Sequence, residues 1–164
     1  MSTETGTLET LERRLRILED KDALWTLLCR YCRVVDDHDW KGFGDMFTED
    51  GILNFVDWGP IQGREKIAKA TSVEEVFQYQ EHSLSNIMFV VDGSDTATAT
   101  GFLTFIATPD ASKREEFAAS GGRYEFTFKR THEGWKVYRH LLTKGWLHGK
   151  SVMESVKYAK HPDV

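Results

Sequence analysis

The stretch Arg30-Tyr31-Cys32-Arg33-Val34-Val35-Asp36-Asp37-His38-Asp39-Trp40 joins the end of an apolar helix pattern to a run of polar residues. Apolar side chains recur along it and before it at the spacing of one buried helix face: Leu24, Leu27, Leu28, Tyr31, Cys32 and Val35. A continuing helix places the Asp36 carboxylate on that same face. A desolvated carboxylate must be paired, is a stronger base, and can hold a histidine in one orientation. Alternatively, the polar run is a solvated turn at the helix end.

The composition is that of one ordinary globular domain, residues 1–164, with a helical N-terminal extension (1–19) and a C-terminal tail (145–164). The net charge of -5 and the lack of a basic stripe argue against a nucleic-acid partner. No apolar run has the length of a membrane span, and no signal peptide is recognisable, so we expect a cytoplasmic protein. Cys29 and Cys32 fall within the helical face, which favours buried reduced thiols over a disulfide or a zinc site.

Helices come first in the chain and strands afterwards. We expect helices over 8–18, 23–35, 40–47 and 64–79. Acidic residues at 19–22 separate the first two helices, and we expect a turn at 48–51 and a tight connection at 59–63. Strands are expected over 52–56, 83–91, 96–108, 121–130 and 135–143. The first helix, with leucines at 8, 11, 15 and 18, packs on the outside or meets a partner subunit. This order predicts an α+β fold in which helices cover one face of a mostly antiparallel sheet. A strongly curved sheet would enclose a cone-shaped, aromatic-lined pocket.

His82 is the second residue of interest. Strand alternation places it on one face with Leu84, Asn86 and Met88. A histidine that faces a pocket can act as a general base if its other ring nitrogen donates to Asp36. A water-exposed histidine at a strand end is the competing interpretation.

Further polar candidates are Tyr31, His38, His140 and Arg139. Alternation groups His140 with Tyr138 and Leu142. It puts Arg139 on the opposite face with Val137 and Leu141, where the arginine either clamps an anionic leaving group or forms a salt bridge. His38 can simply end the helix. No metal-ligand spacing and no glycine-rich cofactor motif occurs, so we expect chemistry by side chains alone, without metal or cofactor. Aromatic residues that line the pocket or fill the core are Trp58, Phe77, Tyr79, Phe102, Tyr124 and Trp146.

The order of these motifs resembles the SnoaL-like branch of the nuclear transport factor 2-like superfamily, from about Asp20 to Lys150. The motifs are the Tyr31-to-Asp36 helix end, the Phe47-Thr48-Glu49-Asp50-Gly51 segment, the Gly63-Arg64-Glu65 helix start, His82 before the first long strand, and Gly134-Trp135-Lys136-Val137. The resemblance implies a cone-shaped α+β barrel, a homodimer or homotrimer, and an active site inside the cone.

Within that superfamily the chain is most similar to cofactor-free lyases: bile-acid 7α-dehydratase, scytalone dehydratase and hexachlorocyclohexane dehydrochlorinase. The resemblance implies that His82 removes a proton, that Asp36 orients it and that Tyr31 assists. Where the bile-acid enzyme has an acidic residue on the next strand, this chain has Thr104-Phe105-Ile106. Help for the leaving group must then come from Tyr31, His38, Arg139 or His140.

The implied function is a lyase acting on a hydrophobic cyclic or aromatic small molecule, by dehydration, carbon–carbon cleavage such as deformylation, or isomerisation. Asn86 and the aromatic residues Trp58, Phe102 and Tyr124 would contact the substrate. A non-catalytic binding or assembly subunit, including the small subunit of a ring-hydroxylating oxygenase, is the alternative, because one fold hosts many functions.

Overall fold

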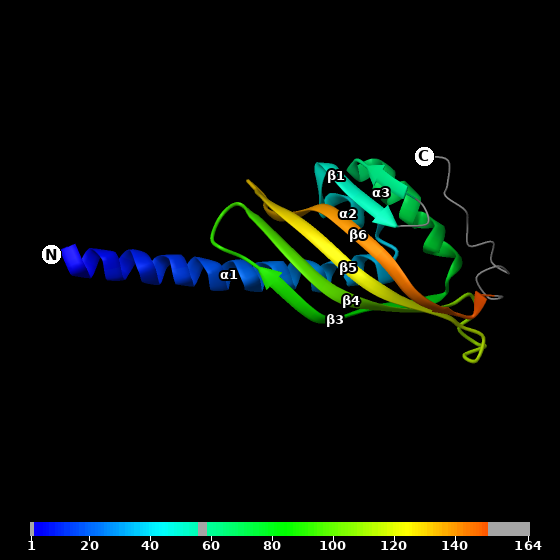
Figure 1. Ribbon diagram of the computed structural model, residues 1–164. Coiled ribbons are helices and arrows are strands. Elements are labelled where there is room, and N and C mark those ends of the chain that lie inside the picture. Colours follow the sequence, from blue (N-terminus) through cyan, green and yellow to red (C-terminus); the bar gives the residue numbers. More distant parts are fainter. Residues whose placement is uncertain (1, 56–58, 151–164) are drawn as a thin grey trace.

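A six-stranded sheet with helices over one face makes up the body of the computed structural model, which describes residues 2–55 and 59–150 (Figure 1). The helices are α1 (Ser2–Asp36), α2 (Trp40–Asp45), α3 (Arg64–Thr71) and the 3-10 helix η1 (Ser72–Val76). The strands are β1 (Phe47–Phe55), β2 (Gly59–Gln62), β3 (Tyr79–Val90), β4 (Thr96–Thr108), β5 (Ala118–Thr131) and β6 (Gly134–His148). None of the helices in this part of the chain is long and apolar enough to cross a membrane.

The sheet has the order β2-β1-β6-β5-β4-β3, and only the β1–β6 pair is parallel. The predicted α+β class with a mostly antiparallel sheet is therefore confirmed. The sheet stays open, because β2 and β3 form its two edges and do not pair with each other. The helices cover what would be the inside of the cone.

Residues of β4 alternate strictly between the two faces of the sheet. Outward-facing residues such as Phe102 are exposed, whereas Leu103 and Phe105 point toward the helices and are buried. Residues of the other elements join them in one core, whose fully buried aromatic members include Tyr31, Phe43, Phe47, Tyr124 and Phe128. Each such side chain stabilises the fold by about 1.5–3 kcal/mol relative to an exposed one.

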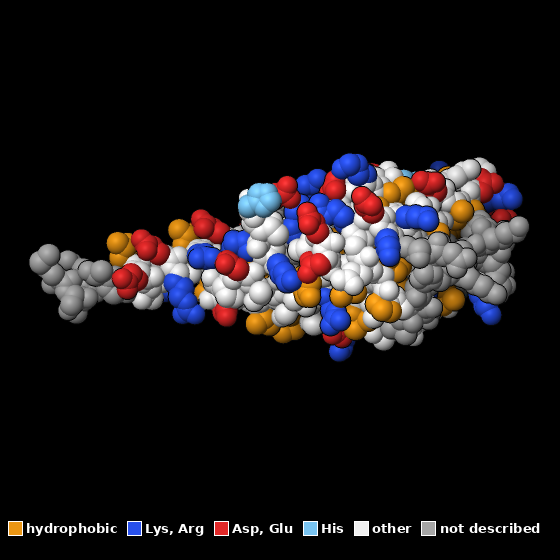
Figure 2. All heavy atoms as spheres, turned by 90° about the horizontal axis from the view of Figure 1, so that it is seen from above, with side chains coloured by type: hydrophobic (Ala, Val, Ile, Leu, Met, Phe, Trp, Pro, Cys, Tyr) orange, Lys and Arg blue, Asp and Glu red, His pale blue; other side chains and the backbone are white. Residues whose placement is uncertain are grey.

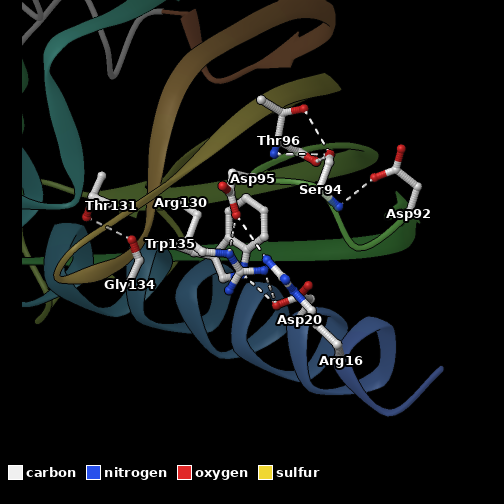
Figure 3. Close-up of polar contacts among 10 residues, drawn as sticks. All are labelled: Arg16, Asp20, Asp92, Ser94, Asp95, Thr96, Arg130, Thr131, Gly134 and Trp135. Atoms are coloured by element: carbon white, nitrogen blue, oxygen red, sulfur yellow. Dashed lines mark hydrogen bonds and ion pairs between the residues drawn. The ribbon is translucent and has the colours of Figure 1, made fainter. Parts of the chain in front are cut away.

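The first helix is continuous, and the break predicted at 19–22 was wrong. Asp20 is only 3% exposed, and its Oδ1 accepts hydrogen bonds from Arg130 Nη2 at 2.6 Å and from Trp135 Nε1 at 3.1 Å (Figure 3). The acidic residue is thus paired inside the protein and does not end the helix. The first half of α1 projects beyond the sheet, and the second half runs across it (Figure 1).

Two further boundaries differ from the sequence prediction. The expected turn at 48–51 is part of β1, where pairing with β6 is irregular between Phe47 and Ile52. The helix expected over 64–79 gives way to the 3-10 helix at Ser72. Hydroxyl groups compete with the backbone there: Thr71 donates to the Ile67 carbonyl and Ser72 to the Lys69 carbonyl, each at 2.9 Å.

Two irregularities in strand pairing change the direction in which side chains of β3 and β6 point. Pairing of β3 with β4 shifts between Ser85 and Met88, and Asn86 takes a φ of 51°. Asn86 and Met88 therefore lie exposed, not on the face of His82 as alternation predicted. A second shift, at Tyr138, turns Val137 inward on the same face as His140, so the predicted grouping of Val137 with Arg139 was also wrong.

Candidate active site

Asp36 and His82 meet where the end of α1 contacts the start of β3. His82 Nδ1 lies 2.7 Å from Asp36 Oδ1. The backbone N–H of His82 also donates to both carboxylate oxygens, at 3.0 and 3.1 Å. The His82 side chain is 8% exposed and the Asp36 side chain 22%. The two residues that the sequence analysis paired, 46 positions apart, are in contact.

The end of α1 is fixed by backbone hydrogen bonds that hold Asp36 in place. His38 adopts a φ of 57°, which lets its N–H donate to the Val35 carbonyl at 3.0 Å and lets Asp39 N–H donate to the Val34 carbonyl at 2.8 Å. The side chain of Gln80, on β3, donates to the same Val35 carbonyl at 2.7 Å. Helix and strand are therefore cross-linked beside the Asp36–His82 pair.

The carboxylate sets the tautomer of His82. An ionised carboxylate only accepts hydrogen bonds, so Nδ1 carries the proton and Nε2 carries the lone pair. The imidazole packs against Phe105, with 4.7 Å between ring centroids. This arrangement offers one basic nitrogen in a largely apolar setting.

His82 stands in the wall between two hollows. A groove of about 270 Å³ runs between α1 and β3 and is lined by Trp25, Leu28, Cys29, Cys32, Arg33, Asp36, His82, Leu84 and Ile87. A smaller interior cavity of about 40 Å³ is lined by Phe55, Glu74, His82, Leu103, Phe105, Ser120, Tyr124, Leu142, Lys144 and Leu147. Asp36 lines only the groove. Because Nδ1 is directed at Asp36, Nε2 lies on the side of the ring away from the carboxylate.

The two cysteines of the groove differ. Cys32 is buried, and burial raises its pKa to about 12, so it stays a neutral thiol. Cys29 is exposed, which corrects the expectation that both thiols are buried. Both are free, as predicted. Among the described residues, no three His, Cys, Asp or Glu side chains are grouped so that they could hold a metal ion.

A second buried pair lies on the concave side of the sheet: Tyr31 Oη and His140 Nδ1 are 2.8 Å apart. Burial raises the pKa of Tyr31 well above 10 and, with a smaller effect of His82, lowers the pKa of His140 to about 3. Both groups are therefore neutral near pH 7. If the Tyr31 hydroxyl donates to Nδ1, the imidazole carries its proton on Nε2, and this buried atom has no hydrogen-bond partner among the described residues.

Not every predicted site residue reaches the interior. Tyr124 does, since it lines the cavity and contacts the His140 ring at a centroid distance of 4.1 Å. Phe102, which is 46% exposed, faces outward by the alternation of β4, and Asn86 and Arg139 are exposed as well. The structure does not bring these three side chains to the interior cavity.

One other predicted contact, His38, also lies away from the cavity. His38 ends α1 and stacks on Trp40 at 5.2 Å between ring centroids. Trp58 lies outside the described residues.

Sequence analysis missed Glu74, a carboxylate on η1 that is 5% exposed and lines the interior cavity together with His82. The sequence did contain a pattern that points to Glu74. Ile67, Ala70 and Glu74 follow the three- and four-residue spacing of one helix face, the same argument that singled out Asp36.

These features define an α+β cone with an imidazole–carboxylate pair in its wall. The SnoaL-like domain model matches residues 16–140, and the chain belongs to this family, within the nuclear transport factor 2-like superfamily. The uncharacterized protein Rv2910c of Mycobacterium tuberculosis is 29% identical over 129 residues, 77% of this chain and 86% of that protein.

Two solved structures share the fold. A candidate scytalone dehydratase from Novosphingobium aromaticivorans is 18% identical, with a TM-score of 0.73 over 82% of this chain and 89% of that one. A hexachlorocyclohexane dehydrochlorinase, LinA type 2, is 13% identical, with a TM-score of 0.72 over 82% of this chain and 91% of that one. At these identities the likeness establishes the fold.

Proposed function

We propose that this protein is a cofactor-independent lyase acting on a hydrophobic cyclic or aromatic small molecule, with His82 as general base. The observation that carries the proposal is the 2.7 Å contact between His82 Nδ1 and Asp36 Oδ1, which leaves Nε2 as the basic nitrogen. The hexachlorocyclohexane dehydrochlorinase that shares this fold supports this reaction class. Dehydration is the preferred reaction; loss of formaldehyde and isomerisation need the same base.

In a dehydration, Nε2 of His82 takes a proton from a carbon next to a carbonyl group, and Asp36 stabilises the imidazolium that forms. The electron pair passes to the carbonyl oxygen and then expels the hydroxyl group on the neighbouring carbon. That hydroxyl leaves as water, with a proton from Glu74 or from the imidazolium itself. The neutral Tyr31–His140 pair packs against Tyr124, which lines the cavity, and adds no charge to that wall.

The lining of the interior cavity supports an apolar substrate with few oxygens, since most of its side chains are aliphatic or aromatic. Its volume of about 40 Å³ is close to the roughly 30 Å³ that one water molecule occupies in the liquid. A cyclic substrate must therefore displace lining side chains when it enters.

Turnover of a panel of β-hydroxy cyclic ketones, followed by the absorbance of the enone product, tests the proposal. His82→Ala and Asp36→Asn should each lower turnover by about a hundred-fold or more, because positioned general bases contribute that much. Glu74→Gln should lower turnover with little change in substrate affinity. Met88→Ala, on the outer face of the sheet, is the matched control and should leave turnover unchanged. Near-normal turnover in His82→Ala, with thermal unfolding unaltered, would sink the mechanism.

The small interior cavity also favours a second candidate, a non-catalytic assembly subunit of the same fold. Such a subunit has no use for a base. It predicts that no compound in the panel is turned over and that His82→Ala still assembles with its partner. Co-purification of a larger iron-containing chain would identify the small subunit of a ring-hydroxylating oxygenase.

A further inference from the structure

A row of exposed leucines follows one face of the projecting half of α1. Leu8, Leu11, Leu15 and Leu18 are between 53% and 63% exposed. Their three-four-three spacing is that of the a and d positions of a heptad repeat, the pattern of a coiled-coil seam. Apolar side chains are visible along this otherwise charged helix in Figure 2. Exposed leucines in such a register indicate a helical partner.

Near the place where this helix leaves the body, its opposite face is bonded to the protein's own β3–β4 loop and to β5. Arg16 Nη2 lies 3.1 Å from Asp95 Oδ1, and Asp20 binds Arg130 (Figure 3). Arg13 also donates to the Asp92 carbonyl at 3.3 Å. Positions 13, 16 and 20 lie on one side of a helix, and the leucines lie on the other. A second helix can therefore run along the leucines while each folded body stays on its own outer side.

The charges that flank the leucines identify the partner. With Leu8 and Leu15 at a, the e positions hold Glu12 and Glu19, and the g positions hold Arg14 and Lys21. In a parallel pair of helices, each g residue faces the e residue of the following heptad across the seam. In each of the two chains, Arg14 would then face Glu19 of the partner subunit. In an antiparallel pair, g faces g and e faces e, which places like charges together.

We propose that residues 8–18 form a parallel, in-register, two-stranded coiled coil with a second copy of this chain. The seam ends at Asp22, which occupies the next a position and is exposed, and from Leu24 onward the helix packs on its own sheet. The coiled coil holds the two bodies on opposite sides of the helix pair. This proposal stands independently of the function of the cone.

Sedimentation equilibrium of the full chain over a range of concentrations measures the assembly. The wild type should have twice the chain mass, and Leu11→Asp/Leu15→Asp should weaken the dimer by at least a hundred-fold while the body melts at an unchanged temperature. Met88→Asp, a charge placed on another exposed apolar position, is the control and should stay dimeric. A wild type that is monomeric at all concentrations, or that has three times the chain mass, overturns the proposal.

A charge exchange tests the parallel register. Arg14→Glu and Glu19→Lys should each weaken the homodimer about tenfold, because each puts like charges across the seam. An equimolar mixture of the two variants should form a heterodimer in which both facing pairs are of opposite charge, and the double variant should regain wild-type affinity. An Arg14→Glu chain that dimerises as tightly as the wild type would indicate an antiparallel pair, in which position 14 faces a like charge in either case, and would overturn the parallel one.

Discussion

The buried imidazole of His140 couples the stability of the fold to pH. Its pKa is lowered from 6.5 to about 3, first because burial disfavours the imidazolium and second because of His82. In the unfolded chain the pKa is near 6.5. Below that pH the unfolded state binds a proton that the folded state does not, so stability that is fully present above about pH 6.5 is lost as pH falls toward 3.

The loss should amount to about 1.4 kcal/mol per pH unit. We therefore expect the wild type to lose about 2 kcal/mol more free energy of unfolding between pH 6.5 and 5 than His140→Gln, in which the titrating ring is gone. Urea unfolding at each pH measures both slopes, and contributions from the carboxyl groups cancel in the comparison. If the free energy of unfolding changed equally with pH in the two proteins, His140 would have to be protonated in the folded state, without unfolding.

At the scale of whole elements, a buried polar cluster fastens α1 to the sheet midway along the helix. Asp20 is buried and accepts hydrogen bonds from both Arg130 and Trp135, and Arg130 also binds Asp95 at 3.0 Å. The guanidinium further packs over the Trp135 ring, 4.4 Å from its centroid. This cluster decides where the helix leaves the body and begins to project.

Removal of the carboxylate should destabilise the protein. Asp20→Ala leaves Arg130 and the Trp135 N–H without their shared acceptor, and we expect the free energy of unfolding to fall by about 2–3 kcal/mol, less than for a fully buried pair because Arg130 is partly exposed. Asp22→Ala, two residues along the same helix and exposed, should change it by less than about 0.5 kcal/mol. Equal effects of the two substitutions in denaturant unfolding would show that the buried cluster contributes nothing.

The elements show where sequence patterns suffice and where they do not. The apolar periodicity before Asp36 dictates which face of the helix is buried. The contact of Asp36 with His82 was one of two interpretations of that histidine, and the family resemblance favoured it. The outward turn of Asn86 depends on how β3 pairs with β4, and pairing has no signature within a single strand. The continuity of α1 through Asp20 depends on Arg130, which is 110 residues away and invisible to a local pattern.

At the scale of the whole molecule, His82 is the one described residue that lines both the interior cavity and the outer groove. A ligand in the groove would approach the ring from the side on which Asp36 already occupies Nδ1. The proposed mechanism needs the basic Nε2 to face the interior cavity, where Glu74 lies in the same wall. It therefore predicts that the substrate binds in the interior, even though the groove is the larger of the two hollows.

Bulky substitutions can distinguish a substrate that binds in the interior cavity from one that binds in the groove. Ser120 lines the interior cavity alone and Ile87 lines the groove alone. Ser120→Phe should lower kcat/KM of the lyase reaction by about tenfold or more, roughly the effect of about 1.4 kcal/mol on a barrier. Ile87→Trp should leave kcat/KM within about twofold. The reverse pattern, with both variants melting as the wild type does, would place the substrate in the groove and require the His82 ring to turn before it could act as a base.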